Sequence, residues 1–165
     1  MTLDNSIRQS IWSQFGAGLD MLENAIQMCP DQLWVTKLNF WYTSYHCIFW
    51  TDYYLTTEPS KFERPKPFTF SEFDPTGKMP ERTYTKTEQL SYLEHCKQKA
   101  NLVISGLTAN KLNERWINNY KNYSLLEILL CHLRHIQHHS AQLNLHLRKN
   151  LNNAPSWVSQ SIIKI

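Results

Sequence analysis

The chain has 165 residues, which is enough for one domain with a sizeable core. Its four glycines are too few for a glycine-rich phosphate loop or for a β fold with many turns. A net charge of +3 without a basic cluster argues against nucleic-acid binding. Four cysteines without close pairing, no signal-like N-terminus and no long apolar run predict a cytoplasmic protein with reduced thiols and no membrane segment.

The first half of the chain predicts two long helices. Residues 4–29 repeat apolar side chains at helical spacing, and Pro30 ends this helix. Residues 36–55 are rich in aromatic side chains, which favours strands, but their length without Gly or Pro favours a helix. One face of that helix would carry His46 and the rings that we expect to wall a substrate pocket, namely Tyr42, Phe49, Trp50 and Tyr53.

Residues 56–84 contain five of the seven prolines and no helical pattern, so they predict a long Pro-rich connecting loop. Long connections inside a compact domain often carry function. Two interpretations stay open, because the loop can cover a pocket or serve as a plain crossover. It is long enough to cross the length of a bundle, which would allow the second and third helices to run parallel.

Two capping boxes mark the starts of the last two predicted helices. Thr85 and Glu88 form the first box, and the helix that it opens ends near Gly106. Ser124 and Glu127 form the second box. Each box places a hydroxyl and a carboxylate where the first free backbone N–H groups of a helix need acceptors.

The last predicted helix runs from the second box to about residue 150. Residues 110–123 precede it as a second long connection, with Trp116 and Ile117 as anchors, and residues 152–165 are expected to form a short final turn or helix. The sequence therefore predicts an all-α fold in which residues 1–165 form a single domain of four long helices with long connections.

Five of the seven histidines lie in this last helix. His132, His135, His139, Gln142 and His146 are spaced three and four residues apart, so they share one inward face. Burying a column of imidazoles costs free energy unless polar partners satisfy them. The spacing therefore predicts a bound metal, a water-filled cavity, or both.

A pair of histidines four residues apart can converge on one ion. His135 and His139 form such a pair, but the Glu of the HExxH pattern is absent, so a third ligand must come from another helix. His46 is the best candidate, because it lies mid-helix on an inward face and at a similar depth. Three neutral imidazoles suit Zn, Ni or Fe(II) and leave positions open for water or substrate. Alternatively, a core histidine is satisfied by hydrogen bonds alone.

The remaining polar groups are assigned supporting roles. His132 and His146 are expected to support the ligands or to replace one, and Gln142 to orient a ring nitrogen or a water, or to form a polar rim. His132 and Gln142 are the candidate catalytic groups, because no Asp or Glu stands where the sequence marks a general base. His95 and His138 are predicted at the surface.

The segment from His135 to Leu143, together with a histidine in the second helix, resembles the DinB/YfiT-like superfamily of metalloenzymes. It follows the pattern H-x-x-H-H-x-G-Q, with Ala141 where the family often has Gly. The resemblance implies a four-helix bundle of up-down-down-up topology, a divalent metal held by His46, His135 and His139, and a frequent homodimer. Characterised relatives include S-transferases and isomerases that use bacillithiol, mycothiol or glutathione, while others are proposed metal-dependent hydrolases.

Three functional hypotheses follow. In the leading one, the protein is a metal-dependent S-transferase, in which the metal lowers the pKa of a low-molecular-weight thiol and this thiol attacks a small electrophile. The alternative enzyme is a hydrolase, in which the metal activates water. A closed site with a fourth ligand from His132 or His146 would instead indicate a non-catalytic bundle that binds a small molecule or a partner protein. A metal-free bundle with a pH-sensitive histidine core is the third.

Overall fold

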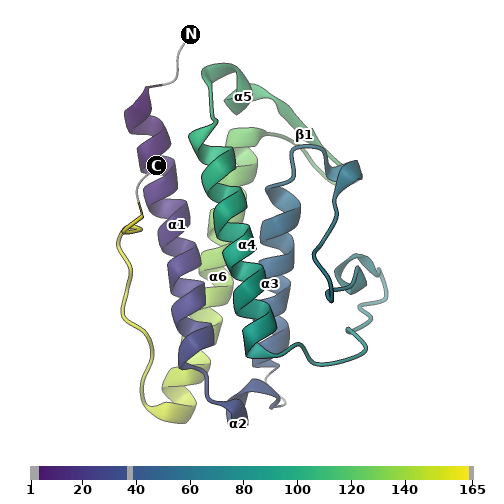
Figure 1. Cartoon of the computed structure of the whole chain (residues 1–165), viewed down its shortest axis with the longest axis vertical. Coiled ribbons are helices and arrows are strands. Elements are labelled where there is room, and N and C mark those ends of the chain that lie inside the picture. The colour runs from purple at the N-terminus through teal and green to yellow at the C-terminus, as the bar shows by residue number, and fades with distance from the viewer. Residues whose placement is uncertain (1–3, 37–38, 164–165) are drawn as a thin grey trace.

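The computed structural model describes residues 4–36 and 39–163. This part of the chain is mostly helical, which confirms the predicted all-α class (Figure 1). Two short helices and two 3-10 helices supplement four long ones. The long helices are α1 (Asn5–Met28), α3 (Phe40–Tyr54), α4 (Lys86–Ser105) and α6 (Leu125–Leu151). The short ones are α2 (Asp31–Trp34), α5 (Ala109–Asn113), η1 (Pro59–Lys61) and η2 (Ser71–Phe73).

The predicted capping boxes of α4 and α6 are confirmed. At α4, the Thr85 hydroxyl accepts a hydrogen bond from the Glu88 backbone N–H at 3.2 Å, and the Glu88 carboxylate accepts one from the Thr85 N–H at 2.8 Å. Ser124 and Glu127 exchange the same pair of bonds at α6. These contacts fix where the histidine-bearing helix begins, and therefore the depth of each of its histidines in the bundle.

The second predicted helix begins later than expected. Asn39 adopts a left-handed backbone conformation with φ of 49°, so the helix begins at Phe40 rather than at residue 36. Residues 37 and 38 of the predicted range lie outside the described residues. The later start still leaves His46 within one residue of the midpoint of α3, as predicted.

The parallel run of the second and third long helices is found in the structure. Near the starts of α3 and α4, the Ser44 hydroxyl donates to Gln89 Oε1 at 2.6 Å, and near their ends Lys99 Nζ donates to Asp52 Oδ1 at 2.6 Å. Figure 1 shows α1 and α6 running in the opposite direction to α3 and α4. The Pro-rich segment between residues 55 and 85 makes this arrangement possible, because it returns the chain along the length of the bundle.

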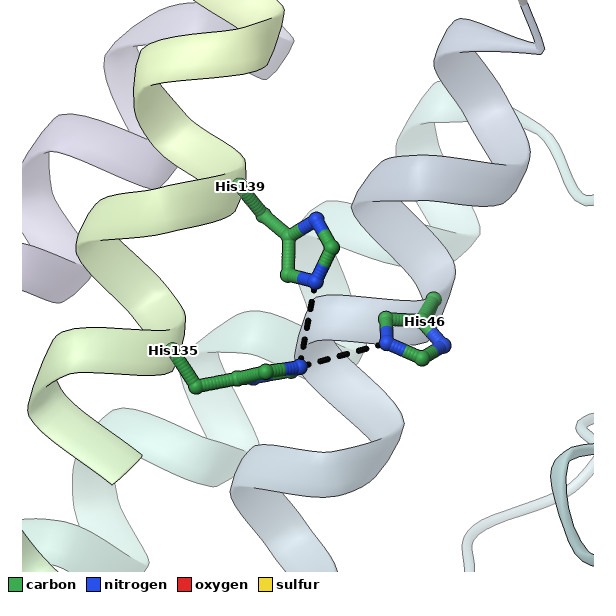
Figure 2. A group of neighbouring side chains, drawn as sticks. All are labelled: His46, His135 and His139. Carbon is green, nitrogen blue, oxygen red and sulfur yellow. Dashed lines mark hydrogen bonds between the residues drawn. The ribbon is translucent and has the colours of Figure 1, made fainter. Parts of the chain in front are cut away.

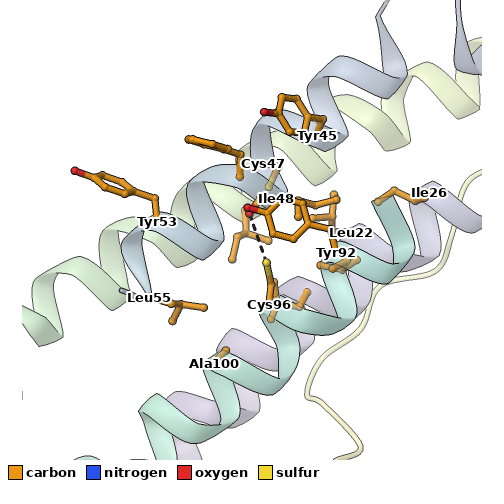
Figure 3. Close-up of a cluster of buried hydrophobic side chains, with 14 of the residues drawn as sticks. Leu22, Ile26, Tyr45, Cys47, Ile48, Tyr53, Leu55, Tyr92, Cys96 and Ala100 are labelled. Carbon is orange, nitrogen blue, oxygen red and sulfur yellow. Dashed lines mark hydrogen bonds between the residues drawn. The ribbon is translucent and has the colours of Figure 1, made fainter. Parts of the chain in front are cut away.

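The hydrophobic core fills the space between the four long helices (Figure 3). Fully buried side chains come from α1, α3 and α4, among them Leu22, Ile26, Ile48, Cys96 and Ala100. Each large apolar side chain buried in this way stabilises the fold by about 1.5–3 kcal/mol. All four cysteines are free, and burial raises the pKa of the Cys96 thiol, which donates to the Ile48 carbonyl. This thiol is therefore a packing group rather than a nucleophile.

A two-stranded hairpin occupies the second long connection, where no strand was predicted. β1 (Arg115–Ile117) pairs antiparallel with β2 (Asn122–Ser124). Trp116 is buried, as expected of an anchor, and its indole N–H donates to the Thr56 carbonyl at 2.8 Å. The expectation for Ile117 is wrong, since this side chain is 55% exposed on the opposite face of the strand. The hairpin thereby lies against the end of α3.

The C-terminal segment is not the short turn or helix that was expected. Residues 152–163 run as an extended chain along α1 (Figure 1). The Ser161 N–H donates to the Ser13 carbonyl at 3.0 Å, and the Trp12 indole donates to the Ile163 carbonyl at 2.8 Å. Gly16 permits this approach, because a Cβ at that position would lie 2.8 Å from the Ser161 Cβ.

Candidate metal centre

Three imidazoles from two helices meet between α3 and α6. His46 comes from α3, His135 and His139 come from α6, and all three rings point toward one another (Figure 2). The His135 Nε2 atom lies 3.2 Å from Nε2 of His46 and 3.1 Å from Nε2 of His139. One nitrogen from each ring lies within 4.8 Å of the other two. The structure therefore brings together the three predicted ligands, close enough to hold a metal ion.

The outer nitrogens of two rings are held by oxygen atoms that accept hydrogen bonds. His46 Nδ1 lies 2.6 Å from Glu72 Oε2, and His139 Nδ1 lies 2.8 Å from Gln142 Oε1. A carboxylate or amide oxygen requires a donor, so each Nδ1 carries a proton and Nε2 is the ring nitrogen left to bind a metal. Gln142 thus orients a ring nitrogen, which is one of the roles predicted for it.

This arrangement suits a cation better than a proton. A proton on His135 Nε2 can point at only one of its two neighbours, His46 or His139, and leaves the other lone pair without a partner. A divalent cation accepts all three lone pairs at once. Metal–nitrogen bonds of about 2.0–2.1 Å separate neighbouring ligand nitrogens by roughly 2.8–3.4 Å in octahedral or tetrahedral coordination. Two of the three observed separations, 3.1 and 3.2 Å, fall in that range, and the third pair, His46 and His139, lies within 4.8 Å.

Burial also keeps the rings of His135 and His139 in the neutral form that a metal needs. Burial, followed by repulsion from His139 and His46, lowers the pKa of His135 to about 3. Burial and the nearby His46 lower the pKa of His139 as well. Near pH 7 these two imidazoles are therefore uncharged, and a metal does not have to displace a proton from them.

Glu72 is a site residue that the sequence analysis missed. Its side chain is only 3% exposed, and Oε2 accepts hydrogen bonds from His46 Nδ1 at 2.6 Å and from Trp50 Nε1 at 2.9 Å. His46 and Trp50 are four residues apart on α3, so one carboxylate bridges both. The segment has no periodicity that marks an inward side. The only hint in the sequence was therefore the place of Glu72 between two aromatic residues, Phe70 and Phe73.

His132 lies beside the three ligands but faces elsewhere. Its ring centroid lies 5.1 Å from that of His135, and its Nε2 lies 2.8 Å from the Thr51 hydroxyl oxygen. That hydroxyl donates its hydrogen to the Cys47 carbonyl at 2.7 Å, so His132 Nε2 is the donor and Nδ1 keeps a lone pair. Burial lowers the pKa of His132 well below its usual value.

The other histidines lie away from the centre. The expectation that His146 supports or replaces a ligand is wrong: seven residues beyond His139, it is about 10 Å further along the helix. It lines a small separate cavity with Leu33 and Phe40. His95 and His138 are exposed, as predicted.

Two adjoining cavities lie beside the centre. The smaller, of about 230 Å³, reaches His46, His132 and His135. The larger, of about 690 Å³, is lined in part by residues 59–60 and 72–75, so the Pro-rich segment does cover a pocket. The two cavities share lining residues on α3 and at the hairpin, which are Trp50, Tyr54 and Lys121. The larger cavity, whose lining contains no histidine, therefore adjoins the smaller one that reaches the histidines.

The four rings predicted to wall a pocket have different positions. Trp50 and Tyr53 line the larger cavity. Phe49 is fully buried in the core, and Tyr42 is half-buried with its ring centroid 6.4 Å from that of His46. Tyr54, which the prediction did not include, stacks on Trp50 with ring centroids 5.5 Å apart and lines both cavities.

No protein-family model, curated protein or solved structure matches this chain. Across residues 4–36 and 39–163, no helix combines the length and the apolar character that crossing a membrane requires. The chemistry of the histidine cluster and its cavities is thus the basis for a functional proposal.

Proposed function

We propose that this protein is a divalent-metal-dependent enzyme of the DinB/YfiT-like superfamily, most simply an S-transferase that joins a low-molecular-weight thiol to a small electrophile. The observation that carries the proposal is the convergence of the Nε2 atoms of His46, His135 and His139 beside two cavities. The parallel run of α3 and α4, with α1 and α6 opposed to them, supports it, since the resemblance implies this order of helix directions.

The ligand set points to an open coordination site. Three neutral imidazoles suit Zn, Ni or Fe(II), and among the described residues no fourth His, Cys, Asp or Glu joins the group. Catalytic sites of this kind keep a position free, whereas structural sites are closed by four protein ligands. Bound there, a divalent cation would supply the Lewis acidity that lowers the pKa of a thiol.

The surrounding residues have distinct tasks in this proposal. Glu72 and Gln142 hold the rings of His46 and His139 with Nε2 directed inward. His132 keeps a lone pair on Nδ1 and lines the smaller cavity, so it is the group placed to accept the proton that a thiol releases. The rings of Trp50 and Tyr54 line both cavities beside the centre.

Thiol-dependent turnover tests the proposed reaction. Protein purified without a histidine tag and loaded with Zn, Ni or Fe(II) is expected to couple a chlorinated nitrobenzene to one member of a panel of low-molecular-weight thiols. The His135→Ala variant should lose this activity, because it lacks the imidazole that neighbours both other ligands. The rate of thioether formation above the uncatalysed reaction is the measurement.

The matched control is His146→Ala, the same substitution on the same helix but outside the centre. It should keep the wild-type rate. Equal rates in wild type and His135→Ala would contradict the proposal. Ester hydrolysis that needs the metal but no thiol would instead identify a hydrolase.

A further inference from the structure

The larger cavity has an aromatic wall of unusual extent. Its lining includes three rings of α3, residues of the Pro-rich segment and the hairpin tip. Trp50 and Tyr54 are stacked at an interplanar angle of 29°, and Tyr53 meets Trp50 edge-on at 78°. Flat aromatic surfaces favour a planar guest ring, which can take offset-stacked or edge-to-face positions against them. The volume of about 690 Å³ is that of a small-molecule site.

The three charged side chains that line this cavity differ in whether they already have hydrogen-bond partners. Glu72 accepts hydrogen bonds from His46 and Trp50, and Asp74 accepts two from Thr76, at 2.8 and 2.7 Å. Lys121 is the remaining charged residue of the lining, and it forms no salt bridge within the described part of the chain. Its ammonium group lies 5.9 Å from the centroid of the Tyr54 ring. The cavity therefore offers an unpaired cation against an aromatic wall.

Lys121 is held in place by Asn118 at the hairpin tip. The Asn118 side-chain oxygen accepts a hydrogen bond from the Lys121 N–H at 2.8 Å, and the Asn118 N–H donates to the Lys121 carbonyl at 3.0 Å. The Asn118 amide also donates to the Tyr53 hydroxyl at 3.1 Å, which ties the tip to α3. The backbone of Lys121 is thus fixed relative to the aromatic wall, so a ligand does not pay to order it.

We propose that the larger cavity binds small aromatic carboxylates, with the ring packed against Trp50 and Tyr54 and the carboxylate paired with the Lys121 ammonium. This inference rests on the proposed function, because the aromatic carboxylate would be the electrophile that the thiol attacks in the proposed S-transferase reaction. For an aryl chloride, the thiol sulfur forms a C–S bond as the C–Cl bond breaks. Chloride leaves with the bonding electron pair, and the thiol proton passes to His132 and from there to solvent.

Binding of unreactive probes tests this inference separately from catalysis. Calorimetric titrations would compare 2-naphthoate, the uncharged 2-naphthamide and the cationic 2-naphthylmethylammonium, with the protein as purified and again after chelator treatment. We expect 2-naphthoate to bind about tenfold more tightly than 2-naphthamide, the scale of one charge-assisted hydrogen bond, with or without metal. Lys121→Met should abolish this preference and leave 2-naphthamide binding unchanged. Lys149→Met, at an exposed position of α6, is the charge-matched control.

The remaining outcomes decide against the inference. Equal affinities for 2-naphthoate and 2-naphthamide, or an unaltered preference in Lys121→Met, would overturn it. Tightest binding of the cationic probe would assign the cavity to ligands of Glu72 and Asp74 instead. If glutathione binds in a Lys121-dependent manner and 2-naphthoate does not, the ammonium serves the thiol rather than the electrophile. A negative result in these titrations does not bear on thiol-dependent turnover. Likewise, an absence of turnover does not bear on the binding of 2-naphthoate.

Discussion

Replacing His135 with alanine is expected to lower the affinity for Zn²⁺ or Ni²⁺ by at least about a hundredfold. Four-ligand zinc sites contribute about 10–16 kcal/mol, which is roughly 3 kcal/mol for each ligand. His135 is the ligand whose loss should matter most, because its Nε2 is the nitrogen within 3.2 Å of both other Nε2 atoms. A competition titration against a chromophoric chelator measures the change.

The same titration on His146→Ala separates a ligand effect from a general effect of removing a histidine from α6. This variant should bind metal as the wild type does, since His146 lines a different cavity. His46→Ala and His139→Ala should resemble His135→Ala. An unchanged affinity in all three ligand variants would remove the metal centre from the account.

Replacing Glu72 with glutamine is expected to weaken metal binding by about 10- to 100-fold, the range typical of residues that hold a ligand histidine. The carboxylate accepts from both His46 Nδ1 and Trp50 Nε1 through one oxygen. A neutral amide is a weaker acceptor for both donors, and it lowers the basicity of the His46 nitrogen that faces the metal. The chelator competition described for His135 gives the affinity.

Glu63→Gln is the matched control for Glu72, because it makes the same change at an exposed position of the same segment. It should leave the affinity unchanged. Hydrogen exchange adds a second readout: residues 70–75 should exchange faster in Glu72→Gln, since the carboxylate joins this segment to α3. Wild-type affinity in Glu72→Gln would mean that His46 needs no carboxylate to hold its ring.

The metal centre could be predicted from the sequence because each contribution to it is periodic. Helical spacing places His135 and His139 on one face of α6, and the uninterrupted aromatic run around His46 indicates an inward face on α3. Capping boxes fix the register of α4 and α6 to the residue. These signals are local, so they can be recognised in the sequence without knowledge of the tertiary structure.

The residues that the sequence did not reveal lie in connections without a period. Glu72 turns inward because His46 and Trp50 supply two donors from another element, and Lys121 reaches the cavity because Asn118 anchors the hairpin tip to α3. Both depend on contacts across long stretches of sequence. His146 shows what helical spacing alone cannot predict. The spacing correctly places it on the same face as the ligands, but it lies two turns beyond the centre.

X-ray absorption spectroscopy of the zinc-loaded, untagged protein tests the central claim most directly. We expect three imidazole nitrogens at about 2.0–2.1 Å, together with at least one further nitrogen or oxygen ligand at the position that the protein leaves open. The same spectrum from His135→Ala should contain fewer imidazole contributions or no stoichiometric zinc. A sulfur ligand at about 2.3 Å, or a shell of oxygen atoms without imidazole, would contradict a metal centre built from His46, His135 and His139.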